Sequence, residues 1–148
     1  MNAVLVVAGI NAAFAGLLAG AEATVTFGVR PALGLLDDGP HLRARQALVR
    51  SLRVFVPSLF LPTVLSSIAV LVLGGGSGAR WAAIVALLAW TLITFLGTVP
   101  VNQAILTWDA DAPPADWRAR IRRWEPLDLA RTVLAALTFA LLVAALGG

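Results

Sequence analysis

The stretch TLITFLGTVPVNQAILTWDADAPPADWRARIRRWEPLDLAR, residues 91–131, decides the fold of this chain. Its first part belongs to a run of 28 residues without a charge, residues 81–108, whereas a helix needs roughly 20 apolar residues to cross a bilayer. On a helix, offsets of three, four and four positions would place four polar residues of this run on one face: Thr91, Thr94, Thr98 and Asn102. Polar groups are unfavourable against lipid, so this face is expected to meet other helices or a cavity.

The composition indicates that the whole chain belongs in a membrane. Of its 148 residues, 59% are hydrophobic and 13% are charged, and the mean hydropathy is +0.89. The absence of cysteine excludes thiolate and disulfide chemistry, and the single histidine argues against a multi-histidine metal or haem site. That histidine, His41, is expected to be a solvent-exposed loop residue. We expect the lipid bilayer as a partner, and neither a cofactor nor a bound metal.

Four apolar runs predict four transmembrane helices in one domain, 1–148. Their expected ranges are about 3–28, 54–73, 81–107 and 127–147. The fold class is therefore all-α, an integral membrane four-helix bundle with up-down-up-down topology. Basic segments in loops one and three predict short interfacial helices beside the spans. Gly16 and Gly20 form a small-xxx-small pair, which would also suit a homo-oligomer of this chain.

The basic residues are all arginine and predict the orientation of the bundle. Nine of them lie around loops one and three, and only Arg80 lies in loop two. The positive-inside rule therefore places loops one and three in the cytoplasm and both termini outside. The same clustering explains the positive net charge as a topology signal, so we expect no nucleic acid partner.

With this topology, polar residues from unrelated positions converge near the cytoplasmic end of the bundle. Glu22 would lie about six residues from the end of its span, roughly 9 Å deep, and Asn102 at a similar depth. Asp128 and Arg131 open the fourth span. Intramembrane ionisable groups are candidates for function, which predicts a polar pocket. The alternative is that Glu22 and Arg131 form an ion pair that only holds the helices together.

Structural interpretations also exist for the remaining candidates. The threonine hydroxyls, including that of Thr98, can bond to carbonyls of their own helix. Trp108 and Trp124 fit an aromatic belt at the membrane interface, although Trp124 is also placed to form a wall of the pocket.

Several segments together resemble the anthrone oxygenase-like family of small four-helix membrane proteins, whose bacterial members are mostly of unknown function. The similarity covers nearly the whole chain. Its most specific segment is residues 98–102, Thr-Val-Pro-Val-Asn, which is similar to a Val-Pro-Leu-Asn segment of the family. The other matching pieces are residues 16–20 with Glu22, residues 29–33, Gln46, Arg50, Arg123-Trp124 and Arg131-Thr132. Where the family often has Trp-Asn-His, this chain has Leu127, Asp128 and Leu129.

The resemblance implies oxidation of an anthrone-like aromatic polyketide by molecular oxygen, without flavin or metal, in a bacterial plasma membrane. Glu22 or Asp128 would be the base that forms the substrate anion, and Asn102 and Arg131 would donate hydrogen bonds to it. The aromatic substrate would contact Thr98 and a wall formed by Trp108 or Trp124. Gln46 and Arg50 would close the cytoplasmic mouth of the pocket.

A non-catalytic role is the alternative to an oxygenase or related tailoring enzyme. The chain would then be a tetraspan binding or assembly subunit, and its buried charges would be structural. The two functions differ in one observable feature. An enzyme needs a cavity that is open to a flat aromatic molecule, whereas a structural ion pair is expected to be closed and dry.

Overall fold

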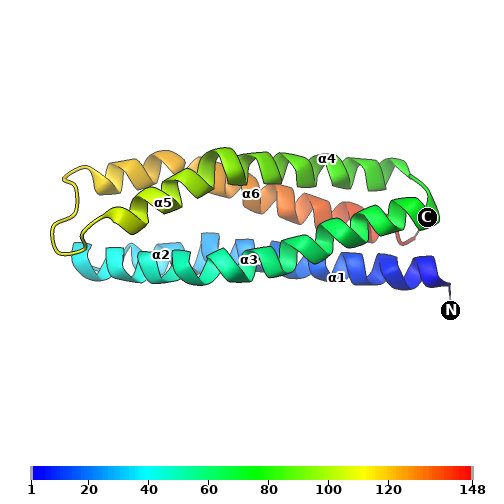
Figure 1. Cartoon of the computed structure of the whole chain (residues 1–148), viewed down its shortest axis with the longest axis horizontal. Helices are drawn as coiled ribbons and strands as arrows, with labels where there is room; N and C mark the ends of the chain where they lie inside the picture. Colours follow the sequence, from blue (N-terminus) through cyan, green and yellow to red (C-terminus); the bar gives the residue numbers. More distant parts are fainter. Residues whose placement is uncertain (1, 148) are drawn as a thin grey trace.

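The computed structural model describes residues 2–147 and is a bundle of four antiparallel helical rods (Figure 1). Each rod is long and apolar enough to cross a membrane, and the described residues contain no strand. The rods are Ala3–Leu33, Asp38–Gly74, Gly78–Thr107 and Trp117–Ala144. This confirms the predicted all-α, four-helix membrane fold.

The second and fourth rods are single, uninterrupted helices: α3, Asp38–Gly74, and α6, Trp117–Ala144. The helical segments expected in loops one and three are present, but they continue directly into the spans. At about 1.5 Å per residue, α3 is roughly 55 Å long, so its first turns extend beyond a hydrocarbon core of about 30 Å. Pro57 and Pro62 lie within α3 and Pro126 within α6.

The first and third rods each contain a π-helical segment that ends two residues before a proline. The first rod consists of α1 (Ala3–Ala23), η1 (Thr24–Val29) and α2 (Arg30–Leu33). The third rod consists of α4 (Gly78–Ile93), η2 (Thr94–Thr98) and α5 (Val99–Thr107). The Arg30 N–H donates to the Val25 carbonyl, and the Val99 N–H donates to the Thr94 carbonyl. Pro31 and Pro100 follow at once and have no N–H to donate. The helix therefore takes up one extra residue per turn at both points.

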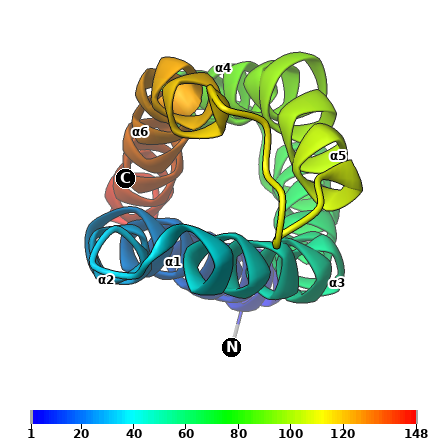
Figure 2. The same cartoon turned by 90° about the vertical axis from the view of Figure 1, so that its left-hand side faces the viewer.

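Seen end-on, the four rods lie around a common axis (Figure 2), but they pack unevenly against one another. α1 packs extensively against α3 and α6, and α4 packs extensively against α6. By contrast, α3 makes few contacts with α4 and α5. The bundle therefore has one loosely packed side, between α3 and the third rod.

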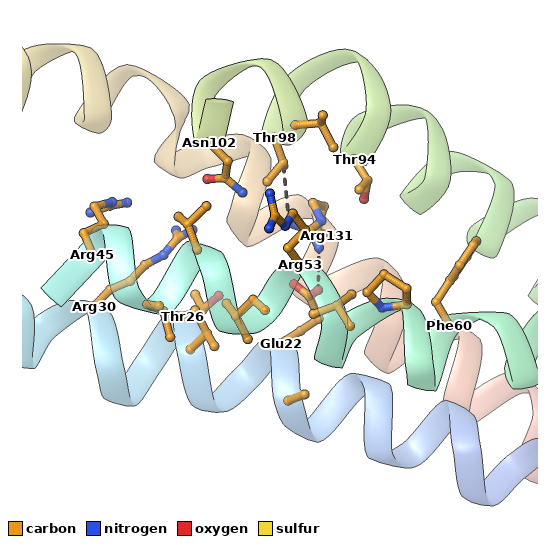
Figure 3. Close-up of a pocket in the computed structure, with 18 of the residues that line it drawn as sticks. Glu22, Thr26, Arg30, Arg45, Arg53, Phe60, Thr94, Thr98, Asn102 and Arg131 are labelled. Carbon is orange, nitrogen blue, oxygen red and sulfur yellow. Dashed lines mark hydrogen bonds and ion pairs between the residues drawn. The ribbon is translucent and has the colours of Figure 1, made fainter. Parts of the chain in front are cut away.

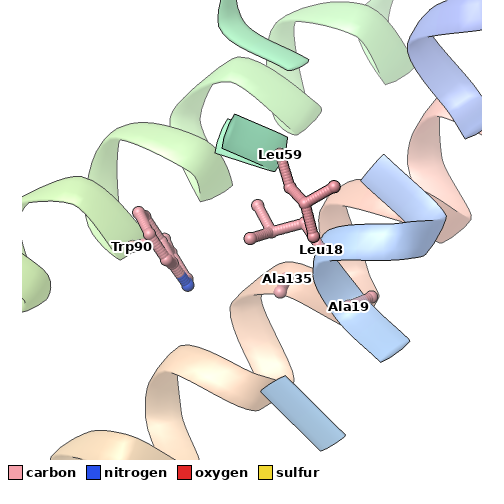
Figure 4. Close-up of a cluster of buried hydrophobic side chains, with 5 residues drawn as sticks. All are labelled: Leu18, Ala19, Leu59, Trp90 and Ala135. Carbon is pink, nitrogen blue, oxygen red and sulfur yellow. The ribbon is translucent and has the colours of Figure 1, made fainter. Parts of the chain in front are cut away.

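Three clusters of buried apolar side chains fill separate levels of the bundle, and two of them lie on either side of its buried charges. One joins all four rods and consists of Leu18, Ala19, Leu59, Trp90 and Ala135 (Figure 4). The other closes the end at the first and third loops and consists of Leu42, Ile105, Trp117 and Ile121. The level between these clusters contains most of the buried charges.

The prediction that His41 is exposed is wrong. The side chain is buried near the start of α3, and its ring meets Trp117 edge-on at 4.9 Å between centroids. The reason is that α3 begins at Asp38, so His41 is part of a helix packed against the first turn of α6. A Cβ at Gly16 would come within 3.0 Å of the Phe139 ring of the same chain, whereas one at Gly20 would have open space around it.

Candidate functional site

A cavity of about 350 Å³ lies at the level between the two apolar clusters. This volume falls within the about 300–1,000 Å³ of small-molecule sites. All four rods contribute to its wall, which combines apolar side chains such as Val56 and Phe60 with ten polar ones: Glu22, Thr26, Arg30, Arg45, Arg53, Thr94, Thr98, Asn102, Gln103 and Arg131. Figure 3 labels these polar residues except Gln103.

The cavity opens sideways, through the loosely packed side of the bundle. Its exposed lining residues are Arg53 and Pro57 on α3, Phe95 on η2 and Gln103 on α5. The loops 34–37 and 108–116 contribute no lining residue. A molecule dissolved in the bilayer could therefore reach the cavity between α3 and the third rod.

Glu22 and Arg131 form a buried ion pair in the wall of this cavity. The Arg131 Nη2 donates to the Glu22 Oε1 at 2.5 Å, and each side chain is 8% exposed. The Arg131 Nη1 donates to the Thr98 hydroxyl at 3.3 Å, and its guanidinium lies 4.8 Å from the Trp90 ring centroid. Among residues 2–147, the only side-chain hydrogen bond of Glu22 is this one, on Oε1.

Asp128 lies next to Arg131 and has three donor side chains around it. Arg30 forms a salt bridge with its Oδ2. The Thr98 hydroxyl donates to its Oδ1 at 3.3 Å, and Arg131 Nη1 lies 3.7 Å from the same oxygen. Asp128 does not line the large cavity, but a small adjoining hollow that it shares with Thr98, Asn102 and Trp124.

The polar face of the third rod divides into two parts. Thr91 and Thr94 donate to the carbonyls of Leu87 and Trp90 within their own helix. Thr98 instead bonds to residues of α6, since it accepts from Arg131 and donates to Asp128. Asn102 lines both the cavity and the small hollow.

The other predicted substrate contacts lie away from the large cavity. Gln46 is buried and donates to the carbonyls of Ile105 and Trp108 at the end of α5, at 2.9 and 2.8 Å. It therefore ties α3 to the C-terminal end of α5. Arg50 is exposed on the surface of α3, and Trp108 packs against the apolar cluster at the loop end. Trp124 lines only the small hollow.

Several lining residues were not among the sequence-based candidates, notably Arg30, Arg45, Arg53, Phe60 and Trp90. From the sequence, Arg30 and Arg45 count toward the topology signal, and Arg53 also falls among the polar residues that begin the second span. A helical pattern could have identified two of them, because Arg45 and Arg53 are eight residues apart and share a face if α3 is continuous. Phe60 stacks on Trp90 at 4.9 Å between centroids at the level of the apolar cluster.

The fold and the site define a class of small polytopic membrane proteins with a charged cavity between the helices. The family model for anthrone oxygenase matches residues 46–141, more than half of the chain. The chain therefore belongs to the anthrone oxygenase family, which confirms the resemblance found in its sequence. Neither a curated protein nor a solved structure was found to match it. Thr98, Asn102, Asp128 and Arg131 lie within the matched range, and Glu22 precedes it.

Proposed function

We propose that this protein is a membrane-embedded oxygenase that oxidises an anthrone-like aromatic substrate with molecular oxygen and without a cofactor. The family match supports an oxygenase-like role. The proposal rests mainly on the cavity, whose lining combines a carboxylate, several hydrogen-bond donors and apolar side chains. Such a combination suits a flat aromatic molecule with polar oxygens. Its open side favours an enzyme over an assembly subunit with a closed, structural ion pair.

Glu22 is our candidate for the base. It lines the cavity, and only one of its two carboxylate oxygens is engaged, by Arg131. Asp128 is less suitable because both of its oxygens have cationic or hydroxyl partners and it lies outside the large cavity. A general base must come within hydrogen-bond reach of the proton that it removes, and Glu22 meets this condition for a ligand in the cavity.

The chemistry is feasible because the anion of an anthrone is delocalised and electron-rich. Glu22 would remove a proton from the benzylic methylene, and the anion would pass one electron to O₂. Combination of the resulting radical and superoxide, with return of the proton, forms a hydroperoxide. Removal of the second methylene hydrogen then breaks the O–O bond and releases water. One anthrone and one O₂ thus give one quinone and one water.

Donors in the wall would stabilise the negative oxygen of the substrate anion. Arg131 and Asn102 both line the cavity, and the Thr98 hydroxyl lies against the Arg131 guanidinium. Fixed donors in a site with little water stabilise a developing charge more than water would. Arg131 would then contact both the base and the substrate oxygen.

Turnover by the purified protein tests this function. In a non-ionic detergent under ¹⁸O₂, we expect anthrone to yield quinone faster than in a protein-free blank, with one labelled oxygen per quinone. A metal chelator is expected to leave the rate unchanged. The proposal is wrong if folded protein gives the blank rate with anthrone and with its hydroxylated analogues.

We also propose that loops one and three face the cytoplasm, as their arginines suggest. The chain has no cysteine, so single cysteines at Ala112 in loop three and Ser77 in loop two are clean reporters. In intact cells, an impermeant maleimide is expected to label Ser77→Cys but not Ala112→Cys. The reverse pattern would invert the proposed orientation.

A further inference from the structure

Two arginines of α3, Arg45 and Arg53, line the cavity but have no role in the proposed reaction. Four arginines and one carboxylate line the cavity. Arg131 is paired with Glu22, and Arg30 is paired with Asp128. Arg45 and Arg53 form no salt bridge and no side-chain hydrogen bond with any of residues 2–147.

These two side chains are placed along one wall of the cavity. They lie eight residues apart on α3, roughly 12 Å along its axis, with Val49 and Leu52 of the lining between them. Figure 3 shows Arg45 toward the loop end, near Asn102, and Arg53 nearer to Glu22 and Arg131. Arg45 is half-buried, whereas Arg53 lies at the open side.

The half-buried Arg45 guanidinium has lost part of its hydration without gaining a salt bridge, which is unfavourable, whereas Arg53 is exposed. Arginine is also suited to bind a carboxylate through two parallel N–H···O bonds. The cavity wall that carries Arg45 and Arg53 thus has the charge and the donors to hold an acidic group.

We infer that the substrate is an acidic aromatic molecule, whose carboxylate is bound at the wall that carries Arg45 and Arg53 while its ring system lies against the apolar side chains. This inference rests on the proposed function and names the substrate class for the same cavity. An anionic lipid headgroup offers similar chemistry, and the test below distinguishes the two sources.

Calorimetric titration with two matched probes, an anthraquinone carboxylate and its neutral carboxamide, tests the inference in non-ionic detergent. We expect the carboxylate to bind about tenfold more tightly or better to the unsubstituted protein, as is typical for a charge-assisted pair. The preference is expected to disappear in the double variant Arg45→Gln/Arg53→Gln. Arg50→Gln is the matched control, because Arg50 is exposed on the same helix outside the cavity, and it is expected to retain the preference.

Equal affinity for the two probes would overturn the inference, as would a preference that survives the double substitution in folded protein. If the site instead binds a lipid headgroup, the preference for the carboxylate probe would be lost in nanodiscs of phosphatidylglycerol but not in those of phosphatidylcholine. This result would also overturn the inference. Failure of the oxygenase proposal is distinguishable, since it would leave the binding preference intact without turnover. Turnover without a preference for the carboxylate probe would refute the acidic substrate class and leave the oxygenase proposal intact.

Discussion

Glu22→Gln is expected to lower the rate of quinone formation by about 100-fold or more, the usual contribution of a positioned general base. The glutamine keeps the size of the side chain and an oxygen that can accept from Arg131, but it cannot take a proton from the substrate. Arg131 also retains Thr98 and Asp128 as neighbours. The protein is therefore expected to stay folded while it loses activity.

The measurement is kcat for anthrone above the spontaneous rate, with thermal unfolding of each variant followed in parallel. Glu125→Gln is the matched control, because it removes an exposed carboxylate of α6 that does not line the cavity. Unchanged turnover in Glu22→Gln would remove Glu22 from the role of base and return Asp128 as the candidate.

Arg131→Gln is expected to destabilise the protein by about 3–5 kcal/mol, the cost of leaving one partner of a buried ion pair uncompensated. The Glu22 carboxylate is 8% exposed and has no other hydrogen-bond donor among the described residues. Adding Glu22→Gln to Arg131→Gln removes this isolated charge. We therefore expect the double variant to be more stable than Arg131→Gln alone.

Denaturant unfolding of the two single variants and the double variant gives the coupling energy directly. Arg50→Gln controls for the loss of an exposed arginine. Additive effects of the two substitutions would show that the ion pair contributes nothing to stability, and the purely structural interpretation of Glu22 and Arg131 would lose its basis.

The architecture could be predicted from the sequence because hydropathy alone decides it. Runs such as residues 81–108 are too long and too apolar for any other environment. The lengths of the helices were harder to predict, because a charged amphipathic segment such as 40–53 carries no signal that separates it from the span that follows. In the structure, α3 runs through both.

An ion pair between Glu22 and Arg131 is one of the two interpretations that the sequence allows, since both are charged residues near the same end of the bundle. The π-helical segments were not anticipated. A proline such as Pro31 or Pro100 indicates a disturbed helix, but it does not distinguish a kink from a π turn. The difference between a kink and a π turn matters for the site, because one extra residue per turn changes which side chains of the rod face the cavity.

The positive-inside rule by itself does not separate arginines with two different roles. Arg45 and Arg50 both satisfy the positive-inside rule, yet Arg45 lines the cavity and Arg50 faces outward. Gln46 shows a similar ambiguity, since only the packing of α3 against α5 reveals that its amide bonds to the carbonyls of Ile105 and Trp108.

The central claim is that oxidation takes place in the cavity between α3 and the third rod, and blocking that cavity tests it most directly. Val56 lines the cavity, whereas Val54 on the same helix is 71% exposed and points away from it. We predict that Val56→Trp reduces anthrone oxidation to the protein-free rate, while Val54→Trp, with the same added bulk, retains the rate of the unsubstituted protein. Equal rates above the blank in both variants, with both folded, would contradict the claim.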